Sequence, residues 1–243
     1  MSAQSSHKVK GVADVVFLID ITGSMDPCIK GLQQNIGAFI KRCREPDELG
    51  GGVPVSDLRI SICGYRDHRD SAAEWFDPAP FISVTDSIAP IEAQLARLKA
   101  SGGGDEPESL LDALFEVGSM PEAGLQDGPQ PNMWRQRARR MVIAFTDATF
   151  HPTISAPAGV GGDSVSVGQL YMAKKIKLML FAPRHACFDD LGAIDGSIVE
   201  FYTDNLKTAQ KDLEVFTRDT SAFRRTLETL AKTVTLDAQV ETL

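Results

Sequence analysis

The stretch ADVVFLIDITGSM, residues 13–25, decides the fold. Its first eight residues form a nearly continuous apolar run that ends in Asp20, and Gly11 stands before it. Such a run is typical of a strand buried on both faces of a parallel sheet. A short polar segment follows, and Asp26-Pro27 then opens an apolar stripe of helical spacing over residues 26–43. The sequence therefore predicts a buried strand, a polar turn and a helix in succession.

The same alternation of short apolar runs and helical stripes continues along the chain. Further strands are predicted over residues 58–64, 81–84, 140–147, 177–182 and 199–203. Further helices are predicted over residues 88–99, 107–119, 164–176 and 221–234, with Pro107 opening the second of these. This alternation predicts an α/β fold with a Rossmann-like, open, mostly parallel central sheet and helices on both faces. Residues 11–243 are expected to form a single domain, and residues 1–10 a disordered N-terminal segment.

The composition is that of an ordinary globular protein. The chain has 243 residues, of which 43% are hydrophobic and 24% charged. These values exclude collagen-like, disordered and coiled-coil proteins. Lys and Arg number 25 and Asp and Glu 33, so the formal net charge is −8. An acidic chain repels the phosphate backbone, and nucleic acid is therefore not an expected partner.

Membrane association and disulfide bonding are not expected from the sequence either. The first apolar run, residues 15–19, is too short for a signal-peptide core or a membrane span, and no later run approaches 18 residues. Cys28, Cys43, Cys63 and Cys187 form no C-x-x-C pair and have no zinc-site spacing. Reduced, mostly buried thiols are typical of a reducing compartment, so a cytoplasmic protein is expected.

Oxygen-bearing side chains gather in three segments near the ends of the predicted strands. These candidate metal ligands are Asp20, Thr22, Ser24, Asp105, Glu108 and Asp147. In open α/β sheets, ligands bind beyond the carboxyl ends of the strands, so the three segments are expected to meet at one edge. Carboxylate and hydroxyl oxygens suit a hard cation such as Mg²⁺. A cation with few protein charges around it accepts one more oxygen from outside, and a carboxylate is the natural donor.

The segment Asp20-Ile21-Thr22-Gly23-Ser24 resembles the D-x-[ST]-x-S signature of von Willebrand factor A (vWA) domains. In that family the metal-ion-dependent adhesion site (MIDAS) combines this motif with a loop Thr and with an Asp that ends the fourth strand. The resemblance covers about residues 11–235 and includes the order of strands and helices. It implies that Asp20, Thr22, Ser24 and Asp147 hold Mg²⁺ (or Mn²⁺). It also implies a protein partner that offers an Asp or Glu side chain to the metal.

One departure from the family pattern concerns the loop Thr, which this chain lacks. Matching by glycines puts Asp105 at that position, and matching by the register of the following helix puts Glu108 there. The string Asp-x-Pro-Glu at residues 105–108 also resembles a loop in the A-like domains of integrin β-subunits, where the Glu is a metal ligand. Glu108 is slightly favoured and both stay candidates. Either acid adds negative charge, which tightens metal binding and weakens the pull on an outside carboxylate.

Two alternatives compete with a metal-dependent interaction domain. Asp20, Thr22 and Ser24 could cap the helix over residues 26–43 without any metal, although Asp147 is then unexplained. The chain could instead be a metal-dependent phosphohydrolase with Asp20 as nucleophile. Such enzymes follow a D-x-D pattern, and Thr22 cannot act as the general acid of the second Asp. Since the chain also lacks a G-x-S-x-G elbow and a P-loop, we expect a protein that is not an enzyme.

Two further polar segments follow predicted strands and are expected to be solvated. The stretch YRDHRD at residues 65–70 predicts a mixed-charge hairpin on the surface. His151, four residues after Asp147, is expected to be a solvent-exposed loop histidine.

Overall fold

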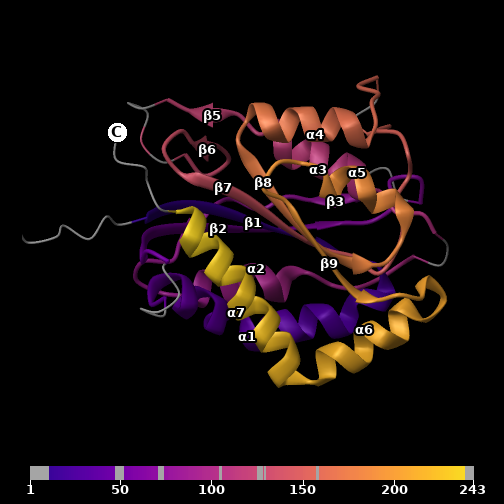
Figure 1. Ribbon diagram of the computed structural model, residues 1–243, viewed down its shortest axis with the longest axis horizontal. Helices are drawn as coiled ribbons and strands as arrows, with labels where there is room; N and C mark the ends of the chain where they lie inside the picture. The colour runs from indigo at the N-terminus through magenta and orange to yellow at the C-terminus, as the bar shows by residue number, and fades with distance from the viewer. Residues whose placement is uncertain are drawn as a thin grey trace, which may run out of the picture.

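A seven-stranded central sheet runs through the molecule (Figure 1). The computed structural model describes residues 11–46, 52–70, 74–103, 106–124, 128, 130–156 and 159–238. The strands of the sheet are β1 (Gly11–Asp20), β2 (Val55–Tyr65), β3 (Phe76–Asp77), β4 (Ile82–Ser83), β7 (Arg139–Phe145), β8 (Ile176–Pro183) and β9 (Ile198–Thr203). Their order is β3-β2-β1-β7-β8-β9, and β4 pairs with β2. The pairings from β2 to β9 are parallel, whereas β3 and β4 run antiparallel to β2.

Strand β1 lies at the centre of this sheet and is buried on both faces. Its side chains alternate between two cores: Val15, Phe17 and Ile19 face one, and Val16 and Leu18 face the other. This alternation explains why the run reads as continuously apolar, since a strand covered by helices on both faces has no solvent side.

The helices cover both faces of the sheet. On one face lie α1 (Asp26–Arg44), α2 (Ala89–Arg97), α6 (Ala209–Arg218) and α7 (Thr220–Asp237) (Figure 1). On the other lie α3 (Leu110–Ser119), α4 (Ser164–Ala173) and α5 (Asp189–Gly192). A small parallel pair, β5 (Glu122–Ala123) with β6 (Trp134–Arg135), stands apart from the main sheet. The predicted α/β fold with a mostly parallel sheet is therefore confirmed.

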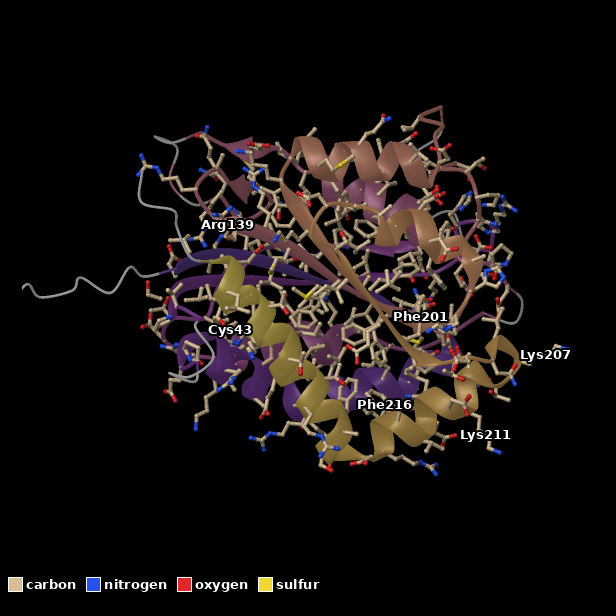
Figure 2. All side chains as sticks on the ribbon, in the orientation of Figure 1. Cys43, Arg139, Phe201, Lys207, Lys211 and Phe216 are labelled. Atoms are coloured by element: carbon tan, nitrogen blue, oxygen red, sulfur yellow. The ribbon has the colours of Figure 1, made fainter. Side chains whose placement is uncertain are left out.

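Close packing fixes the helices of the first face against one another. A Cβ on Gly31 of α1 would lie 3.1 Å from the ring of Phe223 on α7, so the absent side chain lets the two helices approach. On α6, Phe216 packs towards the core while Lys211 points away from the sheet (Figure 2). None of the helices in the described part of the chain combines the length and apolarity that crossing a membrane requires.

The predicted elements are present, with ends that differ by a few residues. The largest local difference lies before α3, which begins at Leu110 and not at Pro107. The peptide bond between Glu106 and Pro107 is cis, and Glu108 forms a parallel bridge with Phe150. The residues before Leu110 thus pair with the loop after β7, and Pro107 does not open the helix as predicted.

Candidate metal centre

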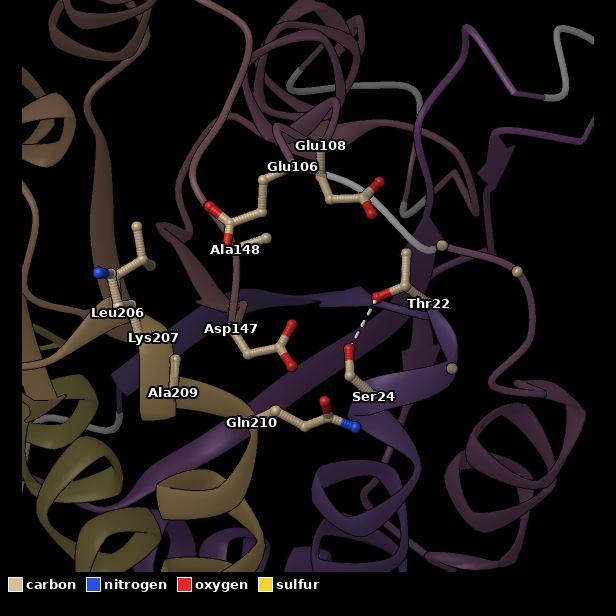
Figure 3. A pocket seen from close by; sticks show the side chains of 13 residues that line it. Thr22, Ser24, Glu106, Glu108, Asp147, Ala148, Leu206, Lys207, Ala209 and Gln210 are labelled. Carbon is tan, nitrogen blue, oxygen red and sulfur yellow. Dashed lines mark hydrogen bonds between the residues drawn. The ribbon is translucent and has the colours of Figure 1, made fainter.

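The end of β1 forms a tight hydrogen-bonded turn around Asp20. Asp20 is the last residue of the strand and is 0% exposed. Its Oδ1 accepts hydrogen bonds from the amide of Thr22 at 2.9 Å and from the Thr22 hydroxyl at 2.7 Å. The Oγ1 of Thr22 lies 3.4 Å from the Oγ of Ser24 (Figure 3). The D-x-T-x-S spacing therefore brings one carboxylate and two hydroxyls together.

The segment after β7 lies directly beside this turn. Strands β1 and β7 are parallel neighbours with Ile19 opposite Phe145, so the residues that follow them meet at the same edge of the sheet. The hydroxyl of Thr146 donates a hydrogen bond to Oδ2 of Asp20 at 3.1 Å. The next residue, Asp147, is buried and directs its carboxylate towards Ser24 (Figure 3).

The third segment is the loop that leads to α3. The amide of Gly23 donates to the carbonyl of Gly102 at 2.9 Å, so this loop lies against the turn after β1. Gly103 has a φ of +72°, and a Cβ there would come within 2.8 Å of the Cβ of Thr22. The loop can approach this closely because the position is a glycine. A Cβ on Gly103 would also lie 3.5 Å from Oε1 of Glu108, so Glu108 borders the turn as well.

A pocket of about 630 Å³ opens where the three segments meet. Figure 3 shows the Thr22 and Ser24 hydroxyls and the Asp147 carboxylate directed into it, with Glu106 and Glu108 on the opposite side. The short 3-10 helix η4 (Leu206–Thr208) and the start of α6 close the remaining wall. Four of the predicted ligands thus line one pocket, and Asp20 lies buried beside it. The remaining acid of the prediction, Asp105, lies outside the described residues.

The acids of this pocket destabilise one another when ionised. Burial raises the pKa of Asp20 above its ordinary value, and the Asp147 carboxylate raises it further. Burial also raises the pKa of Asp147, an effect that a hydrogen bond from Ser24 partly offsets. The pKa of Glu108 is raised to about 8 by burial first and then by the charges of Asp20 and Asp67. A divalent cation would reverse these shifts, because it stabilises the charged form of every neighbouring carboxylate.

The donor set fits a hard cation, and a buried atom points to the same conclusion. Oε2 of Glu108 is buried and has no hydrogen-bond partner among the described residues. Within the same residues, no three His, Cys, Asp or Glu side chains are grouped so that they could hold a metal by themselves. The hydroxyls of Thr22 and Ser24 are therefore needed to complete the site. Carboxylate and hydroxyl oxygens are the ligands that Mg²⁺ and Mn²⁺ accept.

One sequence prediction near the site is wrong and another holds only in part: in the segment over residues 65–70, which is predicted to lie on the surface, only Arg69 and Asp70 are exposed. Asp67 lies in the predicted surface hairpin but is only 8% exposed, and His151 is only 3% exposed. The two side chains contact each other, with His151 Nε2 at 2.9 Å from Asp67 Oδ2. They are 84 residues apart in the sequence, and local patterning carries no signal for such a pair.

Comparison with known proteins gives limited sequence matches. No family model matches this chain. The alpha-protein kinase vwkA of Dictyostelium discoideum is 26% identical over 140 residues, which cover 58% of this chain and 19% of that protein. The match thus spans about a fifth of the length of this curated relative.

Solved structures resemble the chain in fold. The pilus adhesin SpaC from Lactobacillus rhamnosus GG has a TM-score of 0.50 at 12% identity, covering 88% of this chain and 31% of that one. The VWA domain of SpRpn10 has a TM-score of 0.48 at 8% identity, covering 83% and 94%. The mussel byssus protein PTMP1, solved with a zinc-occupied MIDAS motif, has a TM-score of 0.47 at 13% identity, covering 88% and 49%. At these identities the likeness concerns the fold alone.

Three features of this chain together define the arrangement of the fold and the candidate site. The parallel sheet has β1 at its centre, the D-x-T-G-S turn follows β1, and an aspartate follows the neighbouring strand β7. These are the features that the resemblance to von Willebrand factor A domains implies: an open, mostly parallel α/β sheet, in the fold that the chain shares with the pilus adhesin SpaC, with the Asp20-to-Ser24 turn at its carboxyl edge.

Proposed function

We propose that this chain is a cation-dependent protein-interaction domain. It holds Mg²⁺ (or Mn²⁺) at the carboxyl edge of the sheet, and a partner protein binds at the same edge. One observation carries the proposal: Asp20, Glu108 and Asp147 come from three separate segments, are buried, and have raised pKa values where they meet two hydroxyls. Such a cluster is costly unless a cation neutralises it.

The hydrogen bonds indicate different roles for Asp20 and for the residues that face the pocket. Both oxygens of Asp20 accept hydrogen bonds, from Thr22 and from Thr146, so Asp20 would orient the Thr22 hydroxyl for a cation and add negative charge beside it. Thr22, Ser24, Glu108 and Asp147 face the pocket and supply the direct oxygens. Asp105 stays a second candidate for the loop position that Glu108 fills.

The partner supplies a carboxylate to the cation. The pocket is open to solvent, so an Asp or Glu side chain of another protein can enter it. Three protein carboxylates neutralise a divalent cation more fully than two. The attraction for the partner's carboxylate is accordingly weaker than at a site with a loop Thr, and binding depends on the surrounding surface as well.

The phosphohydrolase alternative is not favoured by the geometry. A nucleophilic Asp20 would have to reach a phosphorus atom, but its carboxylate is fully buried and hydrogen-bonded at both oxygens. Thr22 occupies the position of the general acid and donates its hydroxyl proton to Asp20. We therefore propose that the protein acts by binding and not by catalysis.

The cellular setting and the extent of the domain are part of the same proposal. All four cysteines are unpaired, and three of them are buried. Unpaired thiols are typical of proteins of reducing compartments, which favours the cytoplasm. Residues 11–243 form one such domain, and we propose neither nucleic acid nor a membrane as its partner.

Calorimetric titration of Mg²⁺ tests the proposal. Wild-type protein binds the cation, and Asp20→Ala weakens binding by roughly 100-fold or more, since it removes a charge and releases Thr22. Glu228→Gln is the matched control, because Glu228 is a partly exposed acid on α7 that pairs with Arg224. It should bind as wild type does. Equal binding by wild type and Asp20→Ala contradicts the proposal.

Partner capture gives the second half of the test. Proteins retained by the immobilised chain in Mg²⁺ are compared with those retained in chelator, and the same comparison is made for Asp20→Ala. A partner of the proposed kind appears only with wild type and only in Mg²⁺. If every retained protein is also retained in chelator, the cation has no part in the interaction.

A further inference from the structure

A largely buried polar cluster lies behind Glu108, and the function proposed above gives its members no role. It joins the loop after β2, the start of α3 and the loop after β7. We call it the Asp67 cluster, and its members are Asp67, His68, Ser109 and His151. Buried polar groups are costly unless they are fully hydrogen-bonded, so a connected set of four calls for a physical reason.

Asp67 is the centre of the cluster and acts as its acceptor. Its Oδ1 accepts from the Ser109 hydroxyl at 3.0 Å and from the Arg69 amide at 3.0 Å, and its Oδ2 lies 2.9 Å from His151 Nε2. Burial raises the pKa of Asp67, but hydrogen bonds from Arg69, His151 and Ser109 outweigh burial and lower it. Asp67 is therefore ionised, and His151 Nε2 carries the proton that it donates.

His68 completes the hydrogen bonding of Ser109. The hydroxyl proton of Ser109 goes to Asp67, so the oxygen of Ser109 is free to accept from the amide of His68 at 3.0 Å and from its Nδ1 at 2.8 Å. The two histidine rings stand edge to face, with centroids 6.1 Å apart. The cluster thus holds the loop after β2 against the start of α3.

The main chain of Glu108 is tied to this cluster on both sides. Ser109, the next residue, is bonded to Asp67. The carbonyl of Glu108 accepts from the amide of His151 at 3.1 Å, and the amide of Glu108 donates to the carbonyl of Thr149 at 2.9 Å. One carboxylate oxygen of Glu108 has no partner of its own among the described residues. The hydrogen bonds that locate Glu108 at the pocket therefore act on its backbone.

We propose that Asp67 and His151 are positioning residues for the cation site, which fix the backbone of Glu108 so that its carboxylate enters the pocket. This inference rests on the proposed function and deepens it. Neither residue touches the cation. Replacing a residue that orients a metal ligand commonly weakens metal binding by about 10- to 100-fold.

Titration of Mg²⁺ into His151 variants tests the inference. His151→Ala removes the donor to Asp67 and is expected to weaken Mg²⁺ binding by about 10- to 100-fold. In His151→Gln the side-chain amide nitrogen can donate to Asp67 as Nε2 does, and most of the affinity should return. His185→Ala is the matched control, because His185 is an exposed histidine whose side chain accepts a hydrogen bond from the nearby amide of Cys187. It should bind Mg²⁺ as wild type does.

A double-mutant cycle with Glu108→Gln separates positioning from a general loss of structure. If His151 acts through Glu108, His151→Ala should change affinity by less than about 2-fold once Glu108 is already Gln, because the two changes remove one shared contribution. The inference is overturned if His151→Ala binds Mg²⁺ as wild type does. It is equally overturned if His151→Ala weakens Mg²⁺ binding by the same factor whether residue 108 is Glu or Gln.

A substitute variant and a comparison with Asp20→Ala separate failure of the positioning role from failure of the proposed function. If His151→Ala does not fold, Asp67→Asn takes its place in the cycle, since it preserves size and loses the charge that His151 contacts. If wild type binds no Mg²⁺, the proposed function fails and the positioning role fails with it. If wild type binds, Asp20→Ala does not, and both Asp67→Asn and His151→Ala bind normally, only the positioning role is rejected.

Discussion

Two aspartates on strand β1 are fully buried and have opposite surroundings. Asp14, towards the amino end of the strand, accepts hydrogen bonds from Arg59 at 2.9 and 2.7 Å and from Arg135 Nε at 2.9 Å. It also accepts from the Arg135 amide at 2.8 Å. Asp20, at the carboxyl end, accepts only from Thr22 and Thr146 among the described residues, and a second carboxylate, Asp147, lies nearby.

The two ends of the sheet differ in the source of the positive charge that neutralises the buried aspartate. At the amino end the chain supplies its own cations, so the buried charge is neutralised within the fold. At the carboxyl end the donors are neutral and the neighbours are acidic, so a counter-charge has to come from outside. In the first arrangement the buried charges neutralise one another, and we propose that the second is a cation site that costs stability until it is filled.

Breaking the amino-end cluster should have the largest effect on stability. Asp14→Ala leaves the buried Arg59 and the half-buried Arg135 without their shared acceptor, and the free energy of unfolding is expected to fall by about 3–5 kcal/mol. Urea denaturation in chelator measures this loss. Protein that stays folded should still bind Mg²⁺ with wild-type affinity, because the two clusters lie at opposite ends of β1. A selective loss of Mg²⁺ binding in Asp14→Ala would contradict the separation of the two ends.

Filling the carboxyl-end site should stabilise the wild type. At a free Mg²⁺ concentration of 100 times its dissociation constant, the free energy of unfolding is expected to rise by about 2.7 kcal/mol. Thermal or urea denaturation with and without Mg²⁺ measures this gain. Asp20→Ala should show none of it at the same concentration. A metal-free role of Asp20 in capping α1 predicts no cation effect in either protein.

The pH dependence of stability should also distinguish the two ends. The pKa of Glu108 rises from 4.5 to about 8 on folding, so its contribution is complete below about pH 4.5 and is lost as the pH rises through 8. In chelator, wild type should therefore lose stability relative to Glu108→Gln between pH 5 and pH 8. Because the pocket is open to solvent, the expected difference is about 1–2 kcal/mol.

Urea denaturation of both proteins at the two pH values gives the comparison. Saturating Mg²⁺ should reduce the pH-dependent loss in wild type, since the cation stabilises the ionised Glu108. A difference that grows towards low pH would have the wrong sign for a buried carboxyl group whose pKa is raised.

An exposed ion pair close to the site should matter least. Lys30 lies 2.6 Å from Asp26 in the first turns of α1, and both side chains are at least half exposed. Lys30→Ala is expected to lower the free energy of unfolding by at most about 0.5 kcal/mol. The same denaturation experiment measures it. A loss as large as that in Asp14→Ala would mean that burial does not decide which charges matter.

The fold was predictable because its signals are local. The run over residues 13–20 and the stripes over residues 26–43 and 221–234 carry their own periodicity, and β1, α1 and α7 followed from them. The helix α6 was not predicted, although Leu213 and Phe216 lie at helical spacing and face the core. Frequent charged and polar residues between them weaken the apolar stripe of this short helix.

The site was predictable only where residues follow strands. Asp20 and Asp147 were expected to meet because parallel strands end at one edge, and the structure brings their segments together. The roles of Asp67 and His151 depend on contacts between distant segments, and the sequence offers no pattern for them. The choice between Glu108 and Asp105 depended on backbone register before α3, where the bridge to Phe150 replaces the expected first turn of helix.

An anomalous difference map from crystals grown with Mn²⁺ tests the central claim most directly. We predict a single strong peak in the pocket beside Asp147, Ser24 and Glu108, and its disappearance in crystals of Asp20→Ala. Clear density for these side chains with no peak between them would contradict the account, and the carboxyl edge would then not be a cation site.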